Sequence, residues 1–325
     1  MPKKQRHALV CGVTGQDGAF LVSLLKSKGY RIWGTTRAHC SDWPTTSGLA
    51  KLGVSDAVSL IALDPKDEVS VKKVVLEIMP DEIYFLSGQS SVLASFADPV
   101  EAQASIAIGN LNFLEAMRES VKEIRYFNAG SGDCFGDTGD IAATEKTPFS
   151  PKSPYAVAKA SSIWTTSMYR ECYGLYACSG ILFNHESPLR SDRFVTKKIT
   201  DAACRIKQGS DERLNLGNID VWRDWGWAPE YVEAMWKMLQ ATQPKDFIIA
   251  SGVLTSLRTF VEAAFAELDM DWNDHVDLNP KLLRKSDPLV IRADNSAIAQ
   301  ELSWAPQTCG TDVARKMVRA QIEKM

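Results

Sequence analysis

The sequence predicts an α/β protein with a doubly wound parallel sheet and a second, smaller mixed α/β domain. Three observations predict this fold class. Strand-like and helix-like segments alternate through the first half of the chain, a glycine-rich turn joins the first strand to the first helix, and the alternation becomes irregular after Gly174. Such alternation is typical of parallel sheets covered by helices. We therefore expect one domain over residues 1–180, to which 219–245 returns, and a second over 181–325.

Short apolar runs predict the strands of the first domain, and helical patterns lie between them. The strands are expected at 7–11, 31–36, 57–61, 82–86 and 125–128. Helices are expected at 19–26, 69–78 and 108–119, and later at 260–268 and 313–322. Ligands of open parallel sheets bind outside the carboxyl ends of the strands, so the residues that follow these strands are candidates for a site.

A glycine-rich turn after the first strand predicts a Rossmann-type dinucleotide site. Gly12, Gly15 and Gly18 recur at a spacing of three, between the strand and the first helix. Glycines allow a tight turn and close approach of the backbone, and the N-terminus of the helix then faces the pyrophosphate. Gln16 and Asp17, which lie within the same turn, are included in the predicted cofactor site.

The end of the second strand favours NADP over NAD. An NAD site usually places an acid there, whereas an arginine accommodates the 2′-phosphate of NADP. Here Arg37 follows the strand and no acid precedes it. The alternative is that Arg37 is a solvated loop charge.

Small and polar residues follow the next two strands. Asp64 is placed to accept a hydrogen bond from the adenine amino group. Leu86 and Gln89 are expected to line the cofactor, and Ser90 to line the substrate. We expect all of them at the carboxyl edge of the sheet.

A tyrosine and a lysine four residues apart predict acid–base chemistry. Ser153 suits an N-cap and Pro154 suits the first helical position, so Tyr155 and Lys159 lie on one face of a helix. A nearby ammonium favours the phenolate form of tyrosine, which can then take a proton from a hydroxyl group. Such a pair often lies on a solvated helix face, but the dinucleotide features favour the catalytic interpretation.

Bulk properties and cysteine usage limit the classes of function. The net charge is −3, which gives no sign of a nucleic-acid partner, and no apolar run is long enough to span a bilayer. The seven cysteines form no C-x-x-C pair, so a reduced cytoplasmic protein is expected. His185 lacks the second histidine of a zinc-protease helix, and no metal is predicted.

These motifs together resemble the extended short-chain dehydrogenase/reductases, and within them the GDP-mannose 4,6-dehydratase family. The resemblance covers nearly the whole chain. Its most specific segments are residues 12–18, 151–159, 180–188 and 216–226. The first segment occurs in outline across the superfamily, whereas the last two are much more particular to the dehydratases.

The resemblance implies a conversion of GDP-mannose to GDP-4-keto-6-deoxymannose with NADP. Tyr155, helped by Lys159, would take the C4 hydroxyl proton while hydride passes to the cofactor. A carboxylate would remove the C5 proton, water would leave from C6, and the hydride would return to C6. Ser131 and Asp133, just past the fifth strand, match the family's catalytic threonine and glutamate.

The resemblance also implies residues that hold the nucleotide. Asn184, Lys198 and Arg223 match positions that bind the diphosphate, and Arg284 and Asp287 match a later segment near the nucleotide. Arginine is the better bidentate clamp for phosphate. Taken alone, each of the cations Lys198, Arg223 and Arg284 would be interpreted as a surface charge.

The chain departs from the family pattern at several positions. Asp133 is one methylene shorter than the expected glutamate. Gly130 and Gly132 replace hydroxyl residues, which predicts a looser catalytic loop. Leu289 stands where the family has an acid.

The resemblance also implies an assembly, and it leaves alternatives for the activity. The loop after Arg37 lacks the paired arginines and serines through which relatives clasp a neighbour's cofactor, so a homodimer through the Tyr155 helix is expected and a tetramer is not. One alternative is a 4-reductase or epimerase acting on a related GDP-sugar. Another is a nucleotide-sugar-binding protein without catalysis, against which the intact Tyr155–Lys159 pair argues.

Overall fold

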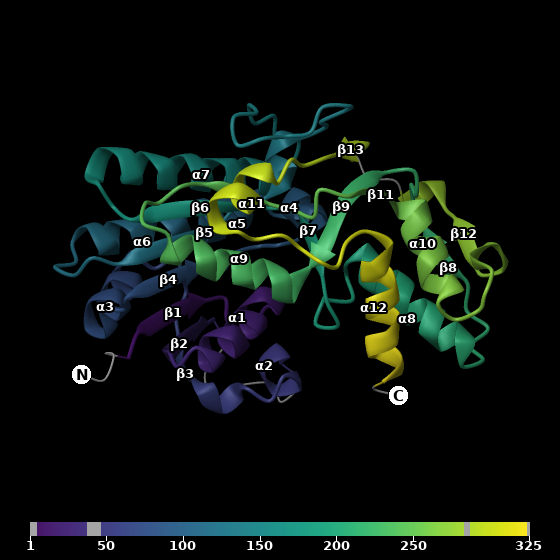
Figure 1. The fold of residues 1–325 in the computed structure, drawn as a ribbon, viewed down its shortest axis with the longest axis horizontal. Coiled ribbons are helices and arrows are strands. Elements are labelled where there is room, and N and C mark those ends of the chain that lie inside the picture. The colour runs from purple at the N-terminus through teal and green to yellow at the C-terminus, as the bar shows by residue number, and fades with distance from the viewer. Residues whose placement is uncertain (1–4, 38–46, 283–286, 324–325) are drawn as a thin grey trace. The chain divides into compact units, whose positions relative to one another are not determined.

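The computed structural model describes residues 5–37, 47–282 and 287–323 (Figure 1). Their contacts divide the chain into two compact units. Unit 1 takes the described residues of 1–134, 151–182 and 232–247, and unit 2 takes those of 135–150, 183–231 and 248–325. None of the described helices combines the length and the apolar composition that a bilayer span requires.

The division moves two of the expected domain boundaries. Residues 135–150 belong to unit 2, because Ala143 forms a β-bridge with Ala293 of that unit. Of the segment 219–245, only the part from Val232 onward returns to unit 1. The earlier part contains strand β9 (Trp222–Trp227), which pairs with strands of unit 2.

The fold-class prediction is confirmed by the large parallel sheet. Its strands are β1 (His7–Cys11), β2 (Arg31–Thr36), β3 (Val58–Ala62), β4 (Glu82–Phe85), β5 (Arg125–Ala129), β6 (Ala177–Leu182) and β10 (Phe247–Ile249). They lie in the order β10-β6-β5-β4-β1-β2-β3. The direction of winding reverses between β1 and β4, which pair in parallel. In sheets of this kind, the crevice at that reversal binds the ligand.

Helices cover the sheet because its side chains alternate between two buried faces. The helices of this part of the chain are α1 (Gln16–Ser27), α2 (Gly48–Lys51), α3 (Glu68–Ile78), α4 (Val92–Ala97), α5 (Pro99–Gln103), α6 (Gly109–Arg118), α7 (Pro154–Tyr173) and α9 (Ala228–Gln240). Phe85 of β4 lies in one core with Phe113 of α6, their ring centres 5.5 Å apart. Tyr169 of α7 joins the same core, so α3, α6 and α7 cover one face together. A π-helical segment, Ala104–Ile108, leads into α6.

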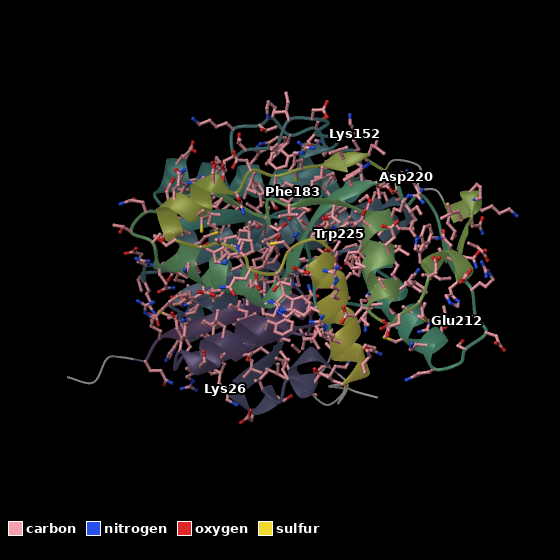
Figure 2. The ribbon with its side chains drawn as sticks, turned by 45° about the vertical axis from the view of Figure 1, so that its right-hand side comes forward. Lys26, Lys152, Phe183, Glu212, Asp220 and Trp225 are labelled. Atoms are coloured by element: carbon pink, nitrogen blue, oxygen red, sulfur yellow. The ribbon has the colours of Figure 1, made fainter. Side chains whose placement is uncertain are left out.

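Unit 2 is built around strand β9. It pairs with β7 (Asn184–Glu186), β11 (Leu254–Ser256) and β13 (Val290–Ile291), and a separate pair joins β8 (Leu214–Leu216) to β12 (Val276–Leu278). The helices are α8 (Val195–Lys207), α10 (Leu257–Ala266), α11 (Ser296–Leu302) and α12 (Thr311–Ile322). Trp225, labelled in Figure 2, is buried against Phe260 of α10 with ring centres 5.1 Å apart. Trp225 and Trp227 of β9 thus belong to the core of this unit.

Candidate active site

The glycine turn of unit 1 has the geometry expected of a cradle for phosphate. Gly12 has a φ of 84°, and a Cβ there would lie 3.0 Å from the carbonyl carbon of Leu86. A Cβ on Gly18 would lie 2.5 Å from the carbonyl oxygen of Gly12. Gly15 is the N-cap of α1. A side chain at Gly12 or Gly18 would therefore collide with the backbone, and the N-terminus of α1 at Gly15 can present its N–H groups to an anion.

Of the residues predicted after β4, Leu86 lies beside this turn. Leu86 donates its backbone N–H to the carbonyl of Cys11 at 3.0 Å, which holds it next to Gly12. Gln89 is partly buried and donates its backbone N–H to Ser105 Oγ at 3.2 Å, whereas Ser90 is exposed. In α1, Gln16 donates to the carboxylate of Asp17 at 3.2 Å. The structure thus brings the Gly12 turn and Leu86 together at the switch point.

Arg37 is exposed but is not an isolated loop charge. Its Nη1 lies 3.1 Å from Oε1 of Glu101, a residue of α5. The other oxygen of Glu101 accepts from Lys66 Nζ at 2.8 Å. Lys66 also lies 3.6 Å from Asp64, the residue predicted to meet adenine. The ends of β2 and β3 therefore share one network of charges.

The Tyr155 helix begins as the sequence predicts, and it buries its lysine. Ser153 Oγ accepts from the backbone N–H of Ala156 at 3.1 Å, and Pro154 is the first residue of α7. Lys159 is only 7% exposed and donates from Nζ to the carbonyl of Ala129 at 2.7 Å. Its Nζ lies 5.9 Å from the centre of the Tyr155 ring. Burial lowers the pKa of Lys159 to about 8, which leaves most of the lysine charged at neutral pH.

Ser131 and Asp133 are tied to the first turn of the same helix. The backbone N–H of Asp133 donates to Ser131 Oγ at 3.2 Å, which closes a short turn after β5. The next residue, Cys134, donates from its thiol to the carbonyl of Ala156 at 3.5 Å. Because Ala156 adjoins Tyr155, these contacts bring all four predicted catalytic residues into one region of unit 1.

Gly130 does not loosen this loop, contrary to the sequence prediction. A Cβ at this position would lie 2.9 Å from Ile163 Cδ1 and 3.0 Å from the carbonyl oxygen of Gly180. The segment is therefore packed between α7 and β6, and the absence of a side chain permits that close contact.

In unit 2 the structure pairs two of the predicted nucleotide-binding residues. Arg223 is buried and donates from Nη2 to Asp287 Oδ1 at 2.7 Å. Asn184 lies on β7, which pairs with the strand that carries Arg223. Lys198 is exposed on α8. Arg284 lies outside the described residues.

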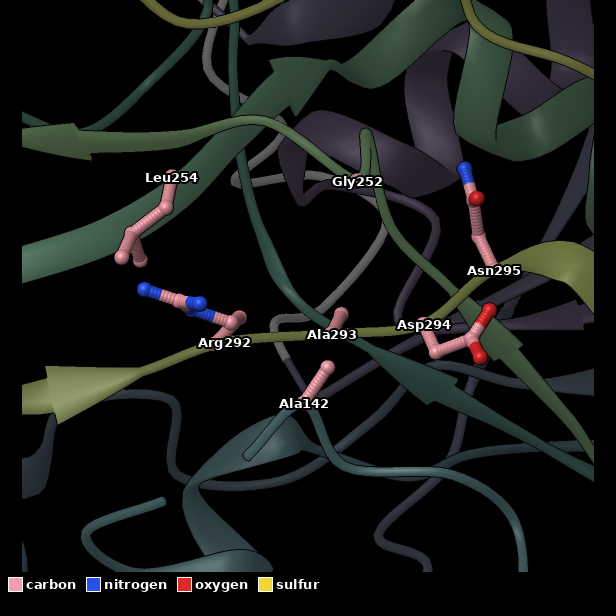
Figure 3. Close-up of a pocket in the computed structure, with 7 residues that line it drawn as sticks. All are labelled: Ala142, Gly252, Leu254, Arg292, Ala293, Asp294 and Asn295. Carbon is pink, nitrogen blue, oxygen red and sulfur yellow. The ribbon is translucent and has the colours of Figure 1, made fainter. Parts of the chain in front are cut away.

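An open hollow of about 500 Å³ also lies in unit 2 (Figure 3). Its lining residues are Ala142, Gly252, Leu254, Arg292, Ala293, Asp294 and Asn295. The Nε of Arg292 is buried without a hydrogen-bond partner among the described residues. None of the residues predicted from sequence lines this hollow.

Comparison with known proteins identifies the family. The family model for GDP-mannose 4,6 dehydratase matches residues 9–317. The chain belongs to the GDP-mannose 4,6-dehydratase family. GDP-mannose 4,6 dehydratase 1 of Arabidopsis thaliana is 40% identical, over 99% of this chain and 91% of the relative. The GDP-mannose 4,6-dehydratase of Sinorhizobium fredii is also 40% identical, over 98% of this chain and 97% of the relative. The resemblance inferred from the motifs is confirmed.

Solved structures share the fold at lower identity. UDP-glucose 4-epimerase from Thermotoga maritima, solved with UDP-glucose, gives a TM-score of 0.85 at 19% identity, covering 98% of this chain and 99% of that one. RMD from Pseudomonas aeruginosa, complexed with NADPH, gives 0.80 at 20% identity and covers 99% of both chains. These likenesses confirm the extended short-chain dehydrogenase/reductase fold around the GDP-mannose 4,6-dehydratase motifs.

Two charged residues near the candidate cofactor site of this GDP-mannose 4,6-dehydratase family member are not predicted from the sequence. Glu101 lies on a short helix and Lys66 on a loop, and both are common surface types. Only the folded contacts single them out, because Glu101 pairs with Arg37 through one oxygen and with Lys66 through the other. The one local signal is that Asp98 is the N-cap of α5 and that Glu101, three residues later, lies in the first turn of the helix.

Proposed function

We propose that the protein converts GDP-mannose to GDP-4-keto-6-deoxymannose in the cytoplasm, with NADP as cofactor. The observation that carries the proposal is the set of contacts that joins the end of β5 to the start of α7. Through Ala129, Cys134 and their partners, these contacts gather a tyrosine, a buried lysine, a serine and a carboxylate. The family match over residues 9–317 supports the substrate.

Tyr155 and Lys159 would carry out the first proton transfer. The charge of Lys159 favours the phenolate of Tyr155, which then accepts the proton of the C4 hydroxyl group. The carbonyl of Ala129 holds the ammonium in place, and burial strengthens its field because little water screens it. The pair would act at neutral pH, since Lys159 keeps its charge there.

The residues present fit a nicotinamide dinucleotide. The turn at Gly12, Gly15 and Gly18 would hold the pyrophosphate, and Gln16 and Asp17 would lie beside it. Leu86 and Gln89 would line the nicotinamide ring. Arg37 and Asp64 would meet the adenosine end. When bound, the nicotinamide would take a hydride from the sugar and return it later, so no net oxidation results.

Asp133 would carry out the elimination. Once C4 is a ketone, the C5 hydrogen is acidic, and the carboxylate of Asp133 would remove it. The protonated carboxyl group can then give that proton to the departing C6 hydroxyl group, so that water leaves. Ser131 Oγ, which accepts from the backbone N–H of Asp133, would keep the loop in register and can donate its own proton to the sugar oxygen at C4.

Unit 2 would supply the groups that hold the nucleotide. Arg223, with Asn184 and Lys198, would bind the diphosphate, and Asp287 would orient the Arg223 guanidinium through their ion pair. Arg284 completes the predicted set. Ser90 is the further residue predicted to contact the substrate.

Mass spectrometry of a single incubation tests the function. The purified protein is mixed with GDP-mannose and a catalytic amount of NADP. Loss of one water from the sugar nucleotide is the expected result. Oxidation of NADPH in a separate incubation with a GDP-4-keto sugar would indicate a reductase. Chromatography distinguishes an isomer of unchanged mass, which would indicate an epimerase, from unchanged GDP-mannose, which would indicate a binding protein.

Replacing Arg37 with alanine is expected to weaken the binding of NADP about tenfold and to leave NAD unchanged, because a charged hydrogen bond to phosphate contributes roughly 1.5–3 kcal/mol. Quenching of tryptophan fluorescence on titration gives both dissociation constants. Equal weakening of NADP and NAD binding would show that Arg37 supports the fold and does not bind the 2′-phosphate.

Replacing Trp164 with glutamate is expected to convert a homodimer to monomers. Val157, Trp164 and Met168 are 44%, 59% and 41% exposed and recur at helical spacing along α7, which is an unusual apolar surface for one helix. Aromatic residues at the centre of an interface commonly contribute at least about 2 kcal/mol. Light scattering at micromolar concentration measures the mass. Val121→Glu, which changes an apolar residue that is 96% exposed elsewhere, should leave the mass unchanged.

A further inference from the structure

The cations at the adenosine end of the proposed cofactor site already have a shared counterion. Glu101 uses one oxygen for Arg37, at 3.1 Å, and the other for Lys66, at 2.8 Å. Asp64 adds a second carboxylate 3.6 Å from Lys66. Two cations face two carboxylates, so the formal charge of the cluster is zero.

The backbone around this cluster is fixed. The N–H of Glu101 donates to Asp98 Oδ1 at 2.9 Å, and the Glu101 carbonyl accepts from Ser105 Oγ at 2.7 Å. The loop that carries Lys66 is held by Asn112, whose Nδ2 donates to the carbonyl of Pro65 at 2.9 Å. The counterion is therefore preorganised beside both cations.

Both cations remain in reach of solvent. The side chains of Arg37 and Lys66 are 65% and 32% exposed, while that of Glu101 is 26% exposed. The hydrogen bond that Lys66 donates to the Glu101 carboxylate is the largest cause of the raised pKa of Lys66. A phosphate that approaches from solvent would thus meet two charged donors, Arg37 and Lys66, each of which is already paired with Glu101.

We infer that Glu101 is a specificity-determining residue that limits the preference for NADP over NAD. The inference rests on the proposed cofactor. A 2′-phosphate carries close to two negative charges and needs the same donors that Glu101 holds. Glu101 competes with the phosphate for Arg37 and Lys66 and repels it at short range. NAD has a neutral 2′-hydroxyl group in place of the phosphate, so Glu101 neither competes with it for the two cations nor repels it.

The test compares Glu101→Gln with a matched control. Glutamine keeps the length of the side chain and one acceptor oxygen but removes the charge. Glu119→Gln is the control, because it makes the same chemical change at a surface ion pair with Lys72. Dissociation constants are measured for NADP and NAD, and for 2′,5′-ADP and 5′-AMP, which report the adenosine end alone.

Glu101→Gln is expected to tighten NADP and 2′,5′-ADP about tenfold, because a unit charge beside the phosphate is removed. Binding of NAD and 5′-AMP should change less than about twofold, and the gain should shrink as salt screens the charges. Adding Lys66→Met should remove most of the gain, since Lys66 would be a donor released by the first change. Glu119→Gln should leave the ratio of the two cofactors unaltered.

Three results would overturn the inference. An unchanged ratio in Glu101→Gln, with both cofactors bound, would overturn the role of Glu101 and leave the proposed cofactor standing. Weaker NADP binding in Glu101→Gln would show instead that Glu101 positions the cations for the phosphate. Failure of the wild-type protein to bind either dinucleotide would overturn both proposals together.

Discussion

Replacing Tyr155 with phenylalanine is expected to lower the turnover of GDP-mannose about 10²–10⁴-fold, the usual contribution of a general acid–base group. The change removes one hydroxyl group and leaves the ring, so α7 should fold as before. The dissociation constants of NADP and GDP-mannose should stay within about twofold, since neither depends on proton transfer. Steady-state kinetics and titration of the cofactor measure these quantities.

The neighbouring lysine provides the companion experiment. Lys159→Met should lower turnover as well, because Tyr155 then loses the charge that favours its phenolate. In that variant the activity should recover partly at high pH, where tyrosine ionises without help. A Tyr155→Phe protein that keeps more than roughly a tenth of the wild-type turnover would place the base elsewhere.

Replacing Asp133 with asparagine is expected to stop the elimination and to spare the first oxidation. Asparagine has nearly the same shape but cannot accept the C5 proton. In heavy water, the wild-type product should carry deuterium at C5, and the variant should exchange none there. Reduced cofactor should still appear in the first turnover, where its absorbance can be followed in a stopped-flow instrument.

Asp133→Glu is the informative counterpart because the family has glutamate at this position. A misplacement of about 1 Å between reacting groups can lower a rate about 10²-fold, so the longer side chain should preserve or raise the activity. Normal turnover of Asp133→Asn would remove this residue from the mechanism. The shorter carboxylate would then be a structural feature of the turn with Ser131.

Much of the first domain can be predicted because local signals and tertiary packing agree there. The strands β1 to β5 lie within one residue of their expected ends, and the start of α7 is encoded by Ser153 and Pro154. Strand β6 is not predicted. Its residues, from Ala177 to Leu182, are all buried, but most are small and carry little strand preference of their own. Its pairing with β5 stabilises it instead.

In the candidate site, too, the features that depend on tertiary contacts are not predicted from the sequence. Gly12, Tyr155 and Lys159 belong to short motifs, and in such motifs one local sequence pattern indicates both the chemistry and the local structure. The anchor of Lys159 on Ala129 joins residues thirty positions apart, and the pairing of Arg37 with Glu101 joins residues sixty-four positions apart. Contacts over such separations depend on the folded sheet, so no local pattern specifies them.

The packing at Gly130 has a consequence for how this loop can evolve. Side chains at 130 and 163 compete for the same space, since a Cβ at 130 would lie 2.9 Å from Ile163. Introducing a serine at position 130 would therefore be harmful in the present background. A smaller residue 163 would relieve part of the crowding, whereas the contact of 3.0 Å with the carbonyl oxygen of Gly180 would remain. The effects of the two substitutions are therefore expected to be epistatic, with the change at 130 less harmful after a side chain on α7 has been shortened.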